Sequence, residues 1–176
     1  MSLLGYHENV AEYGKHWNFF FSLAAVRLLS TLVLGVVRDT RSVWVTSLVI
    51  CILYEGALTL GLADWILSPH TPRDDLLSAN REGLSSSLGY LALYLAGVSW
   101  GQHIFSHNDT TADLWLMLKT LLLWCVLMWL SLGYSLTVFL PPSRRLANYT
   151  FFTWILGIQL LPRIPSVTIF LFQLTI

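Results

Sequence analysis

Three short stretches of this 176-residue sequence concentrate side chains that could act on a hydroxyl or a phosphate group. The first lies near the N-terminus, where His7, Glu12 and His16 are candidates for a general base that takes a proton from a hydroxyl. The other two hold the predicted substrate-binding residues, which are Asn80, Arg81, Glu82, Arg144, Arg145 and Asn148. Arginine forks match phosphate oxygens, so together the three stretches predict a phosphate-binding site beside a hydroxyl to be activated.

The stretch that begins at Asn80 also has a purely structural interpretation. Asn80 is a favourable N-cap residue, and Glu82 would then lie in the first turn of a helix, facing the positive end of its dipole. The residues alone favour neither interpretation, so both remain open.

Two charged residues, Arg27 and Glu55, lie inside long apolar runs. An ionised side chain near the bilayer centre normally has a partner. At 1.5 Å per residue, both would lie roughly 16–18 Å from the same membrane face. We therefore predict a structural ion pair between them on neighbouring antiparallel helices, with a substrate or proton role as the alternative.

His103 and His107 are spaced as two residues on one helix face, which is one way to bind a metal. No glutamate between them completes a zinc-protease signature, and no third ligand is evident. We expect interfacial histidines here, and no metal site.

The composition indicates a membrane protein. Apolar residues make up 55% of the chain and charged residues 11%, whereas soluble domains are typically about 25% charged. Ten basic residues balance ten acidic ones, so nothing indicates nucleic acid as a partner. Membrane lipid is the partner that this composition predicts.

Long apolar runs give the expected organisation. A polar segment, 1–16, precedes a transmembrane domain over 17–161, and an apolar tail of uncertain status follows over 162–176. The runs within the domain are 17–37, 43–67, 84–101, 114–140 and 146–161. Spanning a bilayer takes about 20 residues, so the first four runs suffice, whereas the fifth is short and meets Pro162. We predict an all-α, polytopic transmembrane bundle of four to five spans rather than a soluble helical bundle.

Three blocks in this order carry a family resemblance: YHENVAEYGKHWNFFFSLAAVRLL, SANREGLSSSLGYLALYLAG and SRRLANYTFFTWIL. They resemble the GPI inositol-acyltransferase family, which includes the fungal GPI-anchored wall transfer proteins and the animal phosphatidylinositol-glycan class W proteins. The resemblance implies a multi-pass protein of the endoplasmic reticulum membrane. It also implies transfer of a fatty acyl group from acyl-CoA, as co-substrate, to the inositol ring of glucosaminyl-phosphatidylinositol, with no bound cofactor.

Members of this family are more than twice as long, and this chain resembles a middle-to-late portion of them. The upstream segment that is thought to carry the family's catalytic Asp and Lys pair has no counterpart here. We therefore expect the chain alone to lack acyltransferase activity. From a different class, the alternative is a non-enzymatic helical subunit, such as a transporter component or an assembly partner.

Overall fold

The computed structural model describes residues 13–105 and 110–175 of the chain. Every regular element in these two ranges is helical. The elements are α1 (Phe19–Val36), α2 (Thr40–Ala57), the π-helical turn η1 (Leu58–Leu62), α3 (Ala63–Leu67), α4 (Leu76–Ala79), α5 (Arg81–Phe105), α6 (Thr111–Val138), α7 (Tyr149–Leu160) and α8 (Arg163–Thr175). The all-α transmembrane bundle that the sequence predicts is confirmed.

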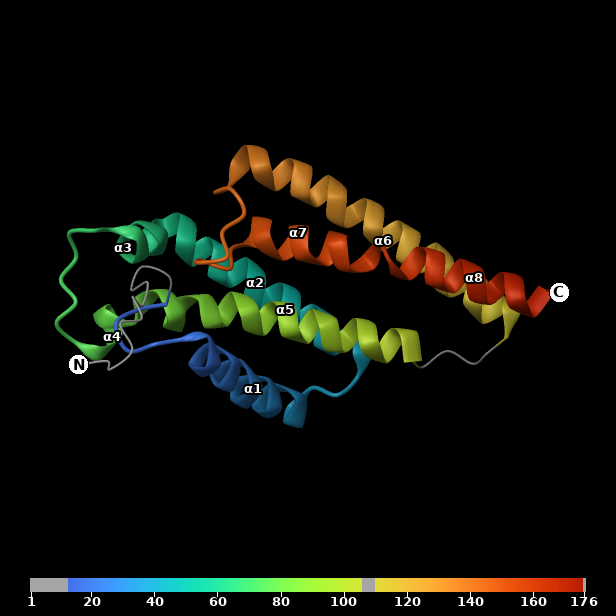
Figure 1. The fold of residues 1–176 in the computed structure, drawn as a ribbon, viewed down its shortest axis with the longest axis horizontal. Helices are drawn as coiled ribbons and strands as arrows, with labels where there is room; N and C mark the ends of the chain where they lie inside the picture. The colour runs from blue at the N-terminus through green and yellow to red at the C-terminus, as the bar shows by residue number, and fades with distance from the viewer. Residues whose placement is uncertain (1–12, 106–109, 176) are drawn as a thin grey trace, which may run out of the picture.

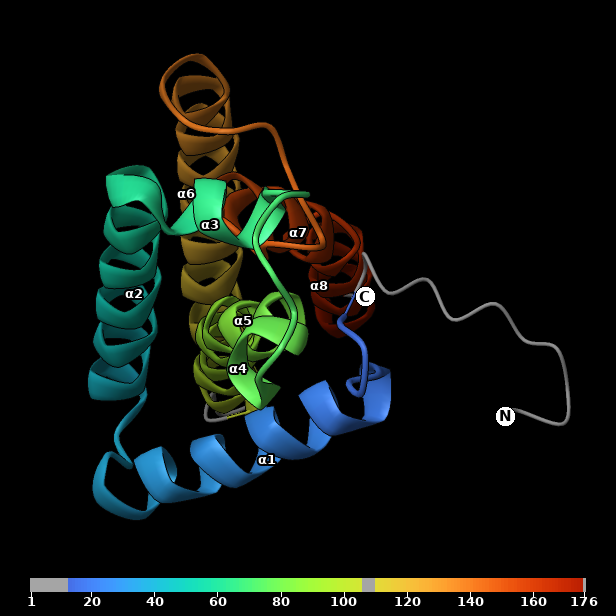
Figure 2. The same ribbon diagram turned by 90° about the vertical axis from the view of Figure 1, so that its left-hand side faces the viewer.

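Helix α5 forms the centre of the bundle (Figure 1). It packs against α2 and α1, while α7 and α8 follow one another along α6. Figure 2 shows that α1 runs across one side of the bundle at a steep angle to α2. The two helices meet only at the short turn that joins them, so residues far from that turn are held apart.

The helix starts follow from the side chains that precede them. Asn18, Asp39, Thr110 and Asn148 each accept a hydrogen bond from a backbone N–H in the first turn of the next helix. Such caps satisfy donors that have no partner inside the helix. The starts of α1, α2, α6 and α7 are thus encoded locally.

Four helical segments are long and apolar enough to cross a membrane: Phe19–Val36, Thr40–Leu67, Thr111–Val138 and Tyr149–Ile169. The last one joins α7 to most of α8, so the predicted fifth run continues beyond 161, past Pro162 and Pro165, into the segment assigned to the tail.

The predicted third run, 84–101, differs from the expectation. It lies within α5, which has 25 residues but is not apolar enough to count among the four. The reason is its position, because a helix surrounded by other helices can carry serine and tyrosine side chains that bond to its neighbours, and glycines that let a neighbour approach closely.

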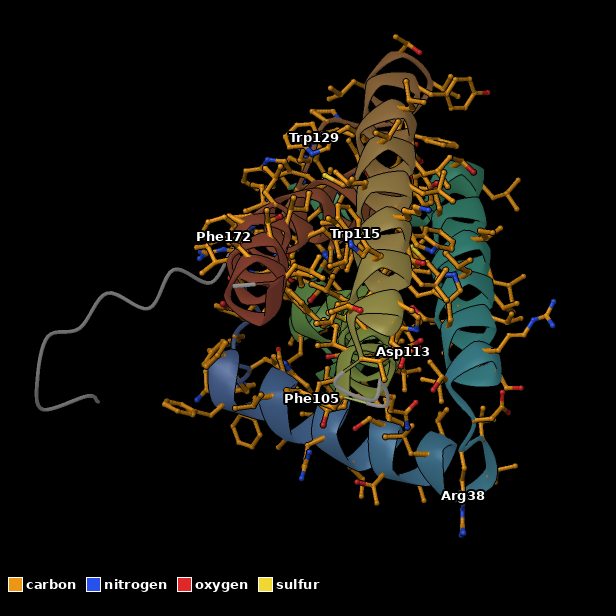
Figure 3. The ribbon with its side chains drawn as sticks, turned by 90° about the vertical axis from the view of Figure 1, so that its right-hand side faces the viewer. Arg38, Phe105, Asp113, Trp115, Trp129 and Phe172 are labelled. Atoms are coloured by element: carbon orange, nitrogen blue, oxygen red, sulfur yellow. The ribbon has the colours of Figure 1, made fainter. Side chains whose placement is uncertain are left out.

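The outer surface of the bundle is apolar. Phe105, Trp115 and Phe172, labelled in Figure 3, are 89%, 53% and 66% exposed, and they belong to three different helices. Apolar patches of this extent are rare on soluble monomers, whereas lipid is a favourable surrounding for them. The structure therefore supports a bilayer as the solvent of this domain.

Polar groups inside the bundle bond between helices. Ser47 donates to the carbonyl of Ala92 over 2.6 Å, and Ser99 donates to the carbonyl of Thr40 over 2.9 Å. A side chain at Gly89 would place its Cβ 2.0 Å from the carbonyl oxygen of Ala147. Gly89 therefore lets the segment before α7 lie directly against α5.

Candidate functional site

The predicted substrate-binding residues gather at one end of the bundle, around the start of α5. Glu82, in the first turn of α5, has a fully buried side chain. It accepts hydrogen bonds from Arg73, in the loop after α3, and from Nη2 of Arg145 over 2.9 Å. Burial would raise the pKa of Glu82, yet the bonds from Arg73 and Arg145 hold it below its ordinary value. Glu82 is thus an ionised carboxylate with two hydrogen-bonded cationic partners, and Nε of Arg81 lies 3.9 Å from the same Oε1.

Arg81 holds the loop between α3 and α4. Its guanidinium donates to the backbone carbonyls of Ile66, Ser68 and Thr71, and it lies 5.7 Å from the centre of the Trp65 ring. The side chain is 1% exposed, and this burial lowers the pKa of Arg81. These contacts give Arg81 a structural role, so the phosphate contact expected from the sequence stays a prediction.

Asn80 joins this end of the bundle to the segment before α1. Its Oδ1 accepts from the backbone N–H of His16 over 2.8 Å, and its Nδ2 donates to the carbonyl of Leu76. The side chain therefore does not bond to the first turn of α5 as a simple N-cap would. The backbone carbonyl of Asn80 does accept from Leu84, so α5 begins where the capping interpretation places it.

Asn148 is fully buried and organises the turn before α7. Its Oδ1 accepts from the backbone N–H groups of Ser143 and Phe151, and its Nδ2 donates to the carbonyls of Leu140 and Pro141. These four bonds use the full capacity of the amide. A direct substrate contact through Asn148 stays a prediction, because its side chain is already committed to the fold.

Arg144 lies beside a cavity of about 400 Å³ between α1, α5 and α7, which we call the tyrosine cavity. Its lining consists of Tyr13, Phe19, Ser22, Leu23, Val26, Tyr90, Leu93, Tyr94, Arg144 and Phe151. The hydroxyl of Tyr90 donates to the backbone carbonyl of Arg144 over 2.8 Å, which fixes the segment before α7 beside the cavity. Apolar walls, three phenol rings and one guanidinium suit an amphipathic ligand with an anionic group.

Of the three candidates for a general base, the structure describes only His16. His7 and Glu12 lie outside the described residues. His16 is exposed and lines a separate shallow cavity with Trp17 and Leu77. A catalytic role for any of the three therefore stays a prediction.

The predicted ion pair between Arg27 and Glu55 is not formed. Arg27 donates to the hydroxyl of Tyr94 over 2.5 Å, and Glu55 accepts from the backbone N–H of Tyr149 over 2.7 Å. The sequence argument compared how deep the two residues lie in the membrane, and it assumed that their two helices pack side by side in antiparallel directions. The steep crossing of α1 and α2 removes that assumption (Figure 2).

Sequence reasoning missed Arg73 and the tyrosines of the cavity. Arg73 was only one charge in a polar loop, although a buried Glu82 needs cations and Arg73 is the nearest basic residue upstream apart from its neighbour Arg81. Tyr90 and Tyr94 are four residues apart on α5, and this spacing on one helix face was the available signal. Among the described residues, no group of three or more His, Cys, Asp or Glu side chains could hold a metal ion.

The comparison with known families decides the relationship, because the GWT1 family model matches residues 1–175. The chain belongs to the GWT1 family. Its relatives in the GWT1 family include the human glucosaminyl-phosphatidylinositol-acyltransferase PIGW, which is 36% identical over 162 residues, covering 90% of this chain and 32% of the relative. The GPI-anchored wall transfer protein 1 of Emericella nidulans is 38% identical over 154 residues, covering 86% of this chain and 30% of the relative.

A third GWT1 relative, the phosphatidylinositol-glycan biosynthesis class W protein of Dictyostelium discoideum, is 35% identical over 158 residues, which cover 89% of this chain and 31% of the relative. The chain thus spans about a third of the length of these curated relatives. The resemblance seen in the sequence is confirmed at the level of the family.

Proposed function

We propose that this chain is part of a glucosaminyl-phosphatidylinositol acyltransferase. The reaction would move a fatty acyl group from acyl-CoA to the inositol ring of glucosaminyl-phosphatidylinositol, in GPI-anchor synthesis at the endoplasmic reticulum membrane. The printed name of the human relative supports the reaction and its lipid acceptor. The four apolar helical segments support a multi-pass membrane protein that meets its lipid substrate in the bilayer.

The observation that carries the proposal is the tyrosine cavity. A glycosylated inositol phospholipid has a phosphate, several hydroxyls and acyl chains, and the cavity offers matching surfaces. Arg144 would contact the phosphate, while Tyr90 and Tyr94 would border the sugar hydroxyls. Leu23 and Val26 of α1 would contact the upper part of an acyl chain. This placement extends the sequence-based assignment of Arg144 to substrate binding.

The test replaces the matching portion of a full-length relative with this chain, in cells that lack their own acyltransferase. We expect the chimaera to restore inositol-acylated precursors and anchored surface proteins. Arg144→Gln should lower acylation roughly tenfold, the size of one lost charged hydrogen bond. Arg38→Gln is the control, because Arg38 is exposed in the turn between α1 and α2 (Figure 3) and is not part of the cavity lining.

Two outcomes would count against the proposal. A chimaera of normal abundance that restores no acylation would favour the non-enzymatic subunit. Equal loss of acylation in the Arg144 and Arg38 variants would show that the tyrosine cavity has no special part in the reaction.

A further inference from the structure

The least buried of the four apolar segments carries an arginine at its middle. Arg27 lies eight residues after Phe19 and nine before Val36, the two ends of α1, and its side chain is exposed. Its Nη1 donates to the hydroxyl of Tyr94 over 2.5 Å, and a phenol is a neutral partner. Arg27 forms no ion pair with any residue of the ranges 13–105 and 110–175. The described part of the chain therefore leaves this positive charge without a counter-ion.

The bond to Tyr94 shows how deep this charge lies. Tyr94 is 13 residues after Arg81 and 11 before Phe105, the two ends of α5. At 1.5 Å per residue, these ends are roughly 20 Å and 16 Å away along the helix. Because α5 runs along the length of the bundle (Figure 1), the guanidinium of Arg27 lies near the bundle's middle, whatever the tilt of α1. The hydrocarbon core is about 30 Å thick, so headgroup phosphates are far from a group at this depth.

A charge at this depth needs an acidic partner. Arginines inside membranes are rare, and they normally pair with a carboxylate or border a polar cavity. The tyrosine cavity does not provide the partner, because Arg27 is not part of its lining. Lipid chains contain no hydrogen-bond acceptor. A carboxylate on a neighbouring transmembrane helix satisfies both the charge and the depth.

The surface around Arg27 has room for such a helix. Ala24, Arg27, Thr31 and Gly35 are spaced by three or four residues, so they share one face of α1, and all four are exposed. We call them the Arg27 face. An added Cβ at Gly35 would meet no atom within 4 Å. Only 17% of the residues of α1 are buried, the smallest share among the four apolar segments. A second helix can therefore approach the backbone of α1 closely enough to reach Arg27.

A second copy of this chain does not offer the matching acid from its described residues. Among these, Glu55 alone lies well inside an apolar segment, and its buried carboxyl accepts from the backbone N–H of Tyr149. The other described acidic residues are in loops or within one turn of a helix or segment end, and they are Asp39, Asp64, Asp74, Asp75, Glu82 and Asp113. The curated relatives are about three times as long as their match to this chain, so they contain further sequence that can supply the acid.

We propose that the Arg27 face binds a transmembrane helix from the remaining part of a full-length GWT1 protein, and that this helix carries an Asp or Glu opposite Arg27. The carboxylate pairs with the guanidinium, which Tyr94 holds from the side of α5. Apolar side chains of the same helix cover Phe20 and Leu28, which are 73% and 65% exposed. The proposal rests on the charge and depth of Arg27, and it does not depend on the acyltransferase reaction.

The first test makes one substitution in two settings, the isolated chain and the full-length chimaera described above. In the isolated chain, Arg27→Leu removes a charge that has no counter-ion, so the melting temperature should stay the same or rise. In the chimaera, the same change leaves a carboxylate unpaired in the membrane, and the melting temperature should fall by about 5 °C or more. Arg41→Leu is the control, because Arg41 is exposed in the first turn of α2 and should respond alike in both settings.

The second test identifies the helix. The photo-crosslinking residue p-benzoylphenylalanine takes the place of Thr31, one turn from Arg27, in the chimaera, and the cross-linked peptide is identified by mass spectrometry. We expect a peptide from outside this chain that holds an Asp or Glu within an apolar run. Arg27→Glu alone should lower the melting temperature of the chimaera, and replacing the identified acid with Arg as well should restore most of the loss.

Two results would overturn the proposal. One is an equal response to Arg27→Leu in the isolated chain and in the chimaera. The other is cross-linking from position 31 only to lipid, to a second copy or to a separate protein. The cross-link is recorded in intact membranes, so it decides the question even where a purified variant is unstable. Neither readout uses acylation, so a chimaera that restores no acylation still tests the contact.

Discussion

Glu82 and Arg145 are separated by 63 residues in the sequence, and their side chains are joined by a hydrogen-bonded ion pair of 2.9 Å. The contact fastens the first turn of α5 to the segment between α6 and α7. Arg73 reaches the same carboxylate from the loop after α3. One buried acidic residue thereby holds three separate parts of the chain at one end of the bundle.

Loss of either cation should weaken this junction. Arg145→Met leaves Arg73 as the one arginine that is hydrogen-bonded to Glu82, so we expect a loss of about 1–3 kcal/mol in the free energy of unfolding. The measurement is unfolding in detergent micelles, with Arg38→Met as the exposed control. When Glu82 is already replaced by Gln, adding Arg145→Met should lower the free energy of unfolding much less than Arg145→Met does in the unaltered chain. Strictly additive effects would mean that the pair contributes no coupling.

Acid should weaken the junction as well. The ordinary pKa of this carboxyl is 4.5, and the folded protein holds the pKa of Glu82 below it. Above pH 4.5 the contribution to stability is complete. It is lost as the pH falls from there through the folded pKa, because the unfolded chain takes up the proton first.

Melting temperatures between about pH 7 and about pH 3 test this expectation. Glu82→Gln should show a smaller acid-induced decrease than the unaltered chain. Asp39 and Asp75 also have lowered pKa values, because Ser42 and Ser78 donate to them, but both are exposed and titrate alike in the two proteins. Parallel curves for the two proteins would contradict the role assigned to Glu82.

Asn148 should resist substitution even by similar residues. Asn148→Ala removes a helix cap and two donors to buried carbonyls, and we expect a loss of about 2–4 kcal/mol. Asn148→Asp keeps the acceptor but not the donors, so its loss of stability should lie between zero and that of Asn148→Ala. The loss should be larger than that if the carboxylate repels the carbonyls of Leu140 and Pro141. Thermal unfolding checks this. A neutral Asn148→Asp would show that the two donated bonds contribute nothing.

Gly89 and Gly35 should respond in opposite ways to the same change. Gly89→Ala would drive a methyl group into the carbonyl of Ala147, so the segment before α7 must shift, at a cost of about 1–3 kcal/mol. Gly35→Ala meets open space and should be neutral or stabilise α1 by up to about 1 kcal/mol. The measurement is the melting temperature of each variant. Equal melting temperatures for Gly89→Ala and Gly35→Ala would contradict the close contact between Gly89 and the carbonyl of Ala147.

The sequence predicted the helical membrane bundle because long apolar runs have few alternatives in lipid. It also named residues that lie around the start of α5, because they stand in short polar segments between the apolar runs; their part in substrate binding stays a prediction. It could not predict their partners. The bond from Arg145 to Glu82 depends on how α5, α6 and α7 pack, and periodicity within one helix carries no information about that packing.

The failed pairing of Arg27 with Glu55 has the same origin. Depth along two helices can be counted from the sequence, whereas the angle between them cannot. The structural role of Asn148 could not be predicted from the sequence either, because its four hydrogen-bond partners are backbone groups brought close by a turn around Pro141 and Pro142. Only the cap that it gives to Phe151 follows a local sequence rule.

The limited apolarity of α5 has a consequence for how the chain enters the membrane during synthesis. Its neighbours α2 and α6 can each partition into lipid as they leave the translocon, but α5 depends on bonds to groups on both sides of it in the sequence. Its Tyr90 and Glu82 bond to Arg144 and Arg145, which are synthesised only after α6. We therefore expect α5 to stay partly hydrated until the segment before α7 emerges, so that the centre of the bundle settles only after α6 has entered the membrane.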